Sequence, residues 1–123
     1  MDGYRDLAQQ LDRFVADRDW TQFHSPKNLA MALAGEVGEL VAELQWLTDT
    51  QIDTGLQAGA ELRGMVEDEV ADVFIYLIRF ADQAGVDLFE AARAKTARNE
   101  VRYPADAVRG RAVKYNRIGK AAF

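Results

Sequence analysis

The sequence predicts an all-α protein built as a four-helix bundle in a single domain over residues 1–123. Apolar residues recur three or four positions apart along most of the chain, which is the period of a helix that buries one face. No stretch of useful length alternates apolar and polar residues as a half-buried strand does. With 123 residues, of which 49% are apolar, the chain is long enough to form a core.

The first helix is expected over about residues 3–18, where Leu7, Leu11 and Phe14 are spaced four and three positions apart. The segment 19–24 breaks this period, so the helix is expected to end before it.

A long second helix is expected to follow. Ser25 and Pro26 are suited to its N-cap and first position, because proline loses no needed hydrogen bond there. Apolar residues at helical spacing then run from Leu29 to Leu47, which predicts that this helix ends near Thr48.

Residues 49–59 are polar and contain two glycines, which predicts a loop. A third helix is expected over about 61–83, with Val70 and Phe74 among its inward-facing residues. Gly85 is placed to end this helix in the left-handed conformation.

A fourth helix is expected to begin after Asp87, because Asp87 and Glu90 have the spacing of a capping box. It is expected to run to Asn99 or Arg102, with a proline shortly beyond it. An irregular basic tail is expected over about 103–123.

Composition excludes several classes of function. The chain has no cysteine and one histidine, His24, so thiolate zinc sites, disulfides, cysteine nucleophiles and catalysis by two imidazoles are ruled out. The chain starts with polar residues, and no apolar run is long enough for a membrane span. We therefore expect a soluble, cytoplasmic protein with no membrane partner.

The net charge of −5 conceals a strong asymmetry. Residues 1–92 carry 18 acidic and 6 basic side chains, whereas residues 93–123 carry 9 basic and 2 acidic ones. This asymmetry indicates either an anionic partner or a contact between the acidic and basic parts. Nucleic acid is disfavoured as the partner, because the acidic body repels a polyanion.

Two pairs of acids are the central feature. Glu36 and Glu39 are three positions apart on the second helix, and Glu69 and Asp72 on the third, so each pair faces one direction beside an apolar stripe. If the two helices are neighbours, four carboxylates converge and must be protonated, paired or bound to metal. The alternative is a solvated acidic surface. Oxygen ligands favour Mg²⁺ or Mn²⁺.

A magnesium site with open positions commonly meets phosphate, and the basic C-terminal part offers cations for it. Lys95, Asn99 and Arg102 share one face of the fourth helix.

Three aromatic residues accompany the acids. Trp46 is placed two turns after Glu39 on the same helix face, Tyr76 one turn after Asp72, and Trp20 before the second helix. Each suits an ordinary core position, but as a set they favour stacking on a nucleobase.

The four acids form the pattern EXXE…EXXD, as Glu36-Val37-Gly38-Glu39 and Glu69-Val70-Ala71-Asp72. This pattern resembles the signature of the MazG-like all-α NTP pyrophosphatases. The resemblance extends over about residues 11–117 and is strongest to the dCTP pyrophosphatase branch, through the segments 19–24, 26–29, 45–46, 72–77, 85–88, 102–104 and 114–115.

The resemblance implies Mg²⁺-dependent hydrolysis of a nucleoside triphosphate, dCTP or a modified dCTP first, to monophosphate and pyrophosphate, and a homo-oligomer, dimer or tetramer. The residues matching metal ligands, and hence the catalytic set, are Glu36, Glu39, Glu69 and Asp72. Those matching base or sugar positions are Trp20, Trp46, Tyr76 and Asn99. Those matching phosphate contacts are Lys95, Arg102, Tyr103, Lys114 and Tyr115.

Two departures from the family pattern leave alternatives open. Leu11 stands where vertebrate members carry a histidine near the base, and Ala42 stands where an acid is common, with Glu43 one position later. A pyrophosphatase for several or noncanonical triphosphates is therefore the first alternative. The second is a helical module that binds nucleotide without hydrolysing it.

Overall fold

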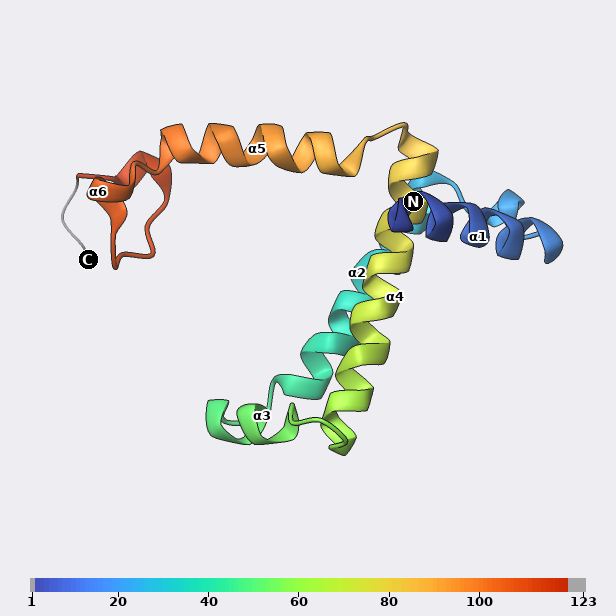
Figure 1. Ribbon diagram of the computed structural model, residues 1–123, viewed down its shortest axis with the longest axis horizontal. Helices are drawn as coiled ribbons and strands as arrows, with labels where there is room; N and C mark the ends of the chain where they lie inside the picture. The colour runs from blue at the N-terminus through green and yellow to red at the C-terminus, as the bar shows by residue number, and fades with distance from the viewer. Residues whose placement is uncertain (1, 120–123) are drawn as a thin grey trace. The chain divides into compact units, whose positions relative to one another are not determined.

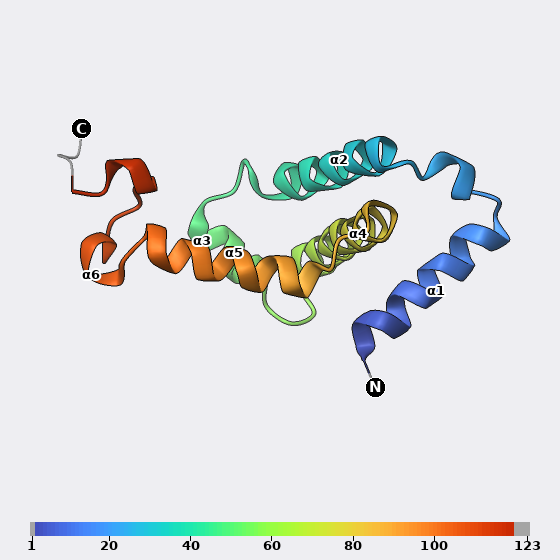
Figure 2. The same ribbon diagram turned by 90° about the horizontal axis from the view of Figure 1, so that it is seen from above.

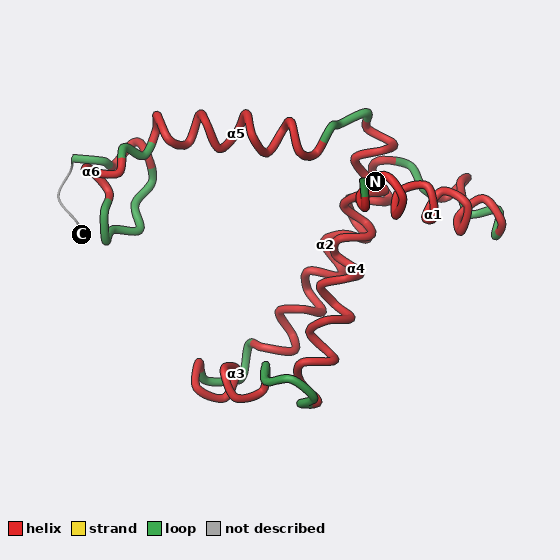
Figure 3. Tube along the Cα trace, viewed as in Figure 1, coloured by secondary structure: helices red, strands yellow, loops and turns green. Residues whose placement is uncertain are grey.

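The computed structural model describes residues 2–119, and all regular structure within this range is helical (Figure 1, Figure 3). Its α-helices are α1 (Gly3–Asp17), α2 (Pro26–Leu44), α3 (Asp49–Gly55), α4 (Glu61–Ala84), α5 (Leu88–Arg102) and α6 (Ala105–Val108). Two short 3₁₀ turns are η1 (Thr21–Phe23) and η2 (Tyr115–Arg117). The all-α class is confirmed, but the expected number of four helices omits α3 and α6. None of the helices in the described range has the length and apolar content needed to cross a bilayer.

The chain divides into two compact units, and the first ends at Val86. In the first unit, α2 and α4 run side by side in opposite directions and make its main packing contact (Figure 1, Figure 2). α1 and α3 also contact α4. Leu29 of α2 and Ile78 of α4 are completely enclosed, with Val15 of α1 also buried. The second unit contains α5, α6 and η2.

Local capping places three helix boundaries where the sequence predicts them. Ser25 accepts a hydrogen bond from the Asn28 backbone N–H at 3.2 Å, at the start of α2. Gly85 ends α4 with a φ of 68°, a left-handed conformation that glycine adopts without steric cost. Asp87 caps α5 by accepting from the Glu90 N–H at 3.0 Å.

The prediction of a loop over residues 49–59 is wrong for residues 49–55, where α3 forms, and is confirmed for residues 56–59. The Gln51 N–H donates to Thr48 Oγ1 at 3.2 Å, and the Thr48 N–H donates to Gln51 Oε1 at 2.9 Å. This reciprocal capping box starts a new helix despite the polar composition. The second helix ends earlier than expected, at Leu44 instead of near Thr48.

Part of the apolar surface expected inside the fold is exposed. Val70 and Phe74 of α4 are 49% and 44% exposed, and Val37 of α2 is 42% exposed. α4 carries more apolar surface than α2 covers. Val70 and Phe74 line an open groove of about 520 Å³ that extends to Leu56 near the end of α3.

Candidate active site

Three carboxylates from two helices meet in the first unit. Glu36 of α2 and Glu69 and Asp72 of α4 offer oxygen atoms that all lie within 4.8 Å of one another. They meet because α2 and α4 are neighbours and because Glu69 and Asp72 are one turn apart. The predicted convergence of the two acid pairs is therefore confirmed for these three residues.

Two carboxylate oxygens of this cluster are buried without a hydrogen bond from residues 2–119 that would offset the loss of water. Glu36 Oε2 and Glu69 Oε2 are buried, and within the described residues neither has a hydrogen-bond partner. Burial, followed by the neighbouring Glu39 carboxyl group, raises the pKa of Glu36. The same causes, with the nearby carboxylates added, raise the pKa of Glu69 to about 7. Orphaned acceptor atoms in a concentrated negative charge fit a divalent cation, which would favour the charged carboxylates.

Glu39 is the fourth acid of the predicted set. It is exposed, unlike Glu36 and Glu69, and it is not one of the three residues whose oxygens cluster within 4.8 Å. Its carboxyl group nevertheless lies near enough to raise the pKa of both glutamates.

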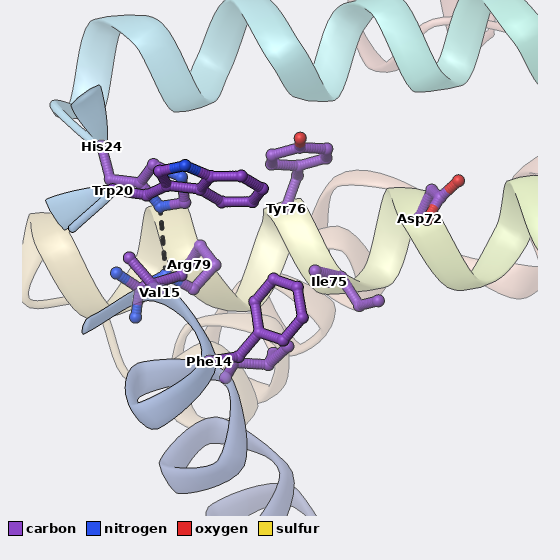
Figure 4. Close-up of a pocket in the computed structure, with 9 residues that line it drawn as sticks. Phe14, Val15, Trp20, His24, Asp72, Ile75, Tyr76 and Arg79 are labelled. Atoms are coloured by element: carbon purple, nitrogen blue, oxygen red, sulfur yellow. Dashed lines mark hydrogen bonds between the residues drawn. The ribbon is translucent and has the colours of Figure 1, made fainter. Parts of the chain in front are cut away.

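A cavity of about 270 Å³ adjoins the carboxylate cluster and shares Asp72 with it (Figure 4). α1, the segment before α2, and α4 each contribute to its walls. Its lining consists of Leu11, Phe14, Val15, Trp20, His24, Asp72, Ile75, Tyr76 and Arg79. The rings of Trp20 and Tyr76, both predicted as base or sugar contacts, therefore lie in one cavity with a metal-ligating carboxylate candidate.

A tight turn directs Trp20 into this cavity. Asp19 adopts a φ of 55°, and the Trp20 N–H donates to the Val15 carbonyl oxygen at 3.0 Å. The Trp20 ring then meets the Phe14 ring edge-on, with centroids 5.8 Å apart and planes at 71°. Phe14 thereby supports a ring that is still 44% exposed and available to a ligand.

Trp46 does not occupy the predicted position on α2. Because α2 ends at Leu44, Trp46 lies in the turn before α3 and is not on the helix face of Glu39. Its side chain is 86% exposed. A role in binding the base stays a prediction.

The predicted phosphate contacts, and Asn99 of the predicted base or sugar contacts, all belong to the second unit. Lys95, Asn99 and Arg102 lie on α5, and Tyr103 follows its last residue. The Arg102 guanidinium lies over the Tyr115 ring, 4.9 Å from its centroid, which brings two of the predicted residues together. Lys114 directly precedes η2. Participation of these residues in the acidic site stays a prediction.

Sequence reasoning missed an ion pair beside the cavity. Arg79 is 3% exposed and pairs with Asp12 of α1. The available signal was a single arginine within the apolar stretch 77–81, seven residues after Asp72 and therefore on the same face of α4. The cavity also contains Leu11, so an apolar side chain lines the wall at that position.

The fold and the site define a class: an all-α protein whose paired helices gather carboxylates beside an aromatic cavity. Residues 24–106 match the MazG nucleotide pyrophosphohydrolase domain. The chain is 44% identical over 111 residues to dCTP pyrophosphatase 1 of Mus musculus, and the alignment covers 89% of this chain and 64% of the mouse protein. It is 40% identical over 117 residues to dCTP pyrophosphatase 1 of Homo sapiens, and this alignment covers 95% of this chain and 68% of the human protein.

A solved structure shows the same fold. The crystal structure of a pyrophosphatase from Archaeoglobus fulgidus DSM 4304 superimposes with a TM-score of 0.78 at 35% identity, over 85% of this chain and 94% of that one. The chain therefore belongs to the MazG nucleotide pyrophosphohydrolase family. It spans slightly less than two thirds of the mouse relative's length, at 64%.

Proposed function

We propose that this chain hydrolyses a deoxynucleoside triphosphate to the monophosphate and pyrophosphate, with dCTP or a modified dCTP as the first candidate. The observation that carries the proposal is the place of Asp72, which belongs both to the carboxylate cluster and to the aromatic cavity. A ligand with a charged end and a flat end fits this arrangement. The two similar mammalian proteins are named as dCTP pyrophosphatases, which supports the choice of substrate.

The ion that fits the cluster best is Mg²⁺, with Mn²⁺ as the alternative, because every available ligand is a carboxylate oxygen. Glu36, Glu69 and Asp72 would hold it, with Glu39 beside them. Such an ion, when bound, neutralises phosphate charge and lowers the pKa of a water molecule. Glu39 is exposed and lies next to the cluster, so it is the carboxylate best placed to accept a proton from the attacking water.

The remaining parts of the substrate would be bound by residues with matching chemistry. Trp20 and Tyr76 present flat rings to the base. Cations of the second unit would bind the triphosphate, in the division of labour typical of polyphosphate sites. The residues predicted to contact phosphate are Lys95, Arg102, Tyr103, Lys114 and Tyr115, and Asn99 is predicted to contact the base or sugar.

A homo-oligomer, dimer or tetramer, accounts for the exposed apolar groove of α4. Val70, Phe74 and Leu56 line this groove together with the charges of Arg63 and Glu67. An apolar surface with an oppositely charged pair at its edge suits a second copy of the chain. A cytoplasmic location stays a prediction, which cell fractionation would test.

The proposed activity is tested by measuring Mg²⁺-dependent pyrophosphate release from each dNTP, each NTP and the modified cytosine triphosphates. Glu39→Gln and Asp72→Asn are expected to lower kcat by about a hundredfold or more while circular dichroism stays unchanged. Asp68→Asn is the matched control, because Asp68 is an exposed acid on α4 next to Glu69. It is expected to retain full activity.

The substrate panel separates the alternatives. Similar turnover of several triphosphates would favour a broad or noncanonical pyrophosphatase. The apolar Leu11 side chain in the cavity wall supports this alternative. Tight binding without hydrolysis would favour a nucleotide-binding module. Unchanged turnover in both the Glu39 and Asp72 variants would refute the proposed site.

A further inference from the structure

Arg79 places a buried positive charge in the wall of the cavity, at the end away from the carboxylate cluster (Figure 4). It follows Asp72 by seven residues on α4, with Tyr76 between them, so the three lie on one face of the helix. At 1.5 Å per residue, Arg79 and Asp72 are about 10 Å apart along the helix axis. The cavity thus extends from the proposed metal-binding end at Asp72 to an end lined by Arg79 and His24 (Figure 4).

Two neighbours hold the guanidinium group of Arg79. Its Nη1 donates to the carboxylate of Asp12 on α1. Its Nε donates to Nδ1 of His24 at 3.4 Å, drawn as the dashed line in Figure 4. Because Asp12 balances the charge of Arg79, this end of the cavity does not offer a free cation to compete for the triphosphate.

The hydrogen bond from Arg79 determines the tautomer of His24. A guanidinium group can only donate, so Nδ1 of the imidazole must accept with its lone pair. A neutral imidazole then carries its proton on Nε2. Burial, followed by the charge of Arg79, lowers the pKa of His24, which keeps the ring neutral near pH 7. His24 therefore lines the cavity as a donor through Nε2 and not as an acceptor.

We propose that Arg79 is a positioning residue that fixes His24 as an Nε2–H donor to an acceptor atom on the base of a bound nucleoside triphosphate. The inference rests on the proposed function, because it takes the cavity as the site of the nucleoside. Ring nitrogens and exocyclic oxygens of nucleobases are acceptors of the required kind. Trp20 and Tyr76 would orient the plane of the base, and His24 would select the edge that it presents.

Two substitutions of His24 separate its two nitrogen atoms. His24→Asn keeps an acceptor near the position of Nδ1 but removes the donor at Nε2. His24→Gln places an amide N–H near the position of Nε2. We expect His24→Gln to keep KM for dCTP within about threefold, and His24→Asn to raise it about tenfold, which equals about 1.4 kcal/mol and suits the loss of one hydrogen bond.

Arg79→Met tests the positioning role. It removes the bond that holds His24 but leaves every carboxylate in place, so KM for dCTP is expected to rise about tenfold while kcat changes less than about threefold. Selectivity among the four dNTPs is expected to fall with it. Arg5→Met is the control, because Arg5 is an exposed arginine of α1 outside this cavity. Thermal melting of each full-length variant checks that the fold is retained.

The outcomes distinguish this inference from the proposed function. If the wild type hydrolyses dCTP but Arg79→Met leaves KM and selectivity unchanged, the positioning role is wrong. Equal effects of His24→Asn and His24→Gln would also overturn it. If the wild type releases no pyrophosphate from any triphosphate and calorimetry detects no binding of dCMP, the proposed function fails, and the inference fails with it.

Discussion

The two side chains of the Asp12–Arg79 ion pair differ strongly in solvent exposure, and this difference predicts how each substitution changes stability. The Asp12 side chain is 59% exposed, whereas that of Arg79 is 3% exposed. Removing Asp12 therefore leaves a buried charge whose other side-chain partner among residues 2–119 is His24. Breaking a fully buried pair costs about 3–5 kcal/mol, and the exposure of Asp12 reduces this, so we expect Asp12→Asn to destabilise the protein by about 2 kcal/mol.

Removing Arg79 has a different expected result. Arg79→Met replaces a buried charge with an apolar side chain of similar length, and Asp12 then turns to water. We expect this variant to lie within about 1 kcal/mol of the wild type. The double variant should match Arg79→Met alone, which corresponds to a coupling energy of about 2 kcal/mol.

Chemical denaturation measures the cycle. At about 3–4 °C per kcal/mol for a chain of this size, Asp12→Asn should also lower the melting temperature by about 6–8 °C. Asp17→Asn is the control, because Asp17 is an exposed acid in the last turn of α1. Its effect should stay within about 0.5 kcal/mol. A loss for Asp12→Asn no larger than that of the control would refute the buried-charge reasoning, as would Arg79→Met being the less stable variant.

Two further predictions concern pH and assembly. Because burial and the charge of Arg79 lower the pKa of His24 below its usual 6.5, the unfolded chain takes up this proton first as pH falls. As the pH falls from about 7.5 to 5.5, the unfolding free energy of the wild type should therefore decrease relative to that of His24→Asn. Both proteins contain Asp12, which balances Arg79, and the acids of α4, so the titration of these groups cancels in the comparison. A difference that is independent of pH would contradict this. For the oligomer, Phe74→Glu puts a charge into the apolar groove and should reduce the mass measured by sedimentation, and an unchanged mass argues against that interface.

The parts of the site that could be predicted from the sequence depend on spacing within one helix. Glu69 and Asp72 are three positions apart, so any α-helix places them on one face, and Glu36 joins them once two apolar stripes pack. Helix ends were equally predictable where one residue acts on its own neighbours, as Ser25 and Gly85 do.

The parts that could not be predicted depend on contacts between distant residues or on local competition. Asp12 and Arg79 are 67 positions apart, and His24 and Arg79 are 55 apart, so no periodic pattern links them. α3 was missed for another reason. Its residues are polar, and the hydrogen bonds between Thr48 and Gln51 outweighed the loop-like composition.

One face of α4 carries four residues of the proposed chemistry in linear order. Glu69 and Asp72 supply carboxylates, Tyr76 supplies a flat ring one turn later, and Arg79 holds His24 one turn beyond that. Because these steps lie at successive turns, a change at the Arg79 end leaves the carboxylate geometry untouched. The proposed metal-dependent hydrolysis and the proposed base selection would therefore vary separately on the same helix. Substitutions at Arg79 and Asp12 accordingly test base selection, whereas substitutions of the carboxylates test hydrolysis.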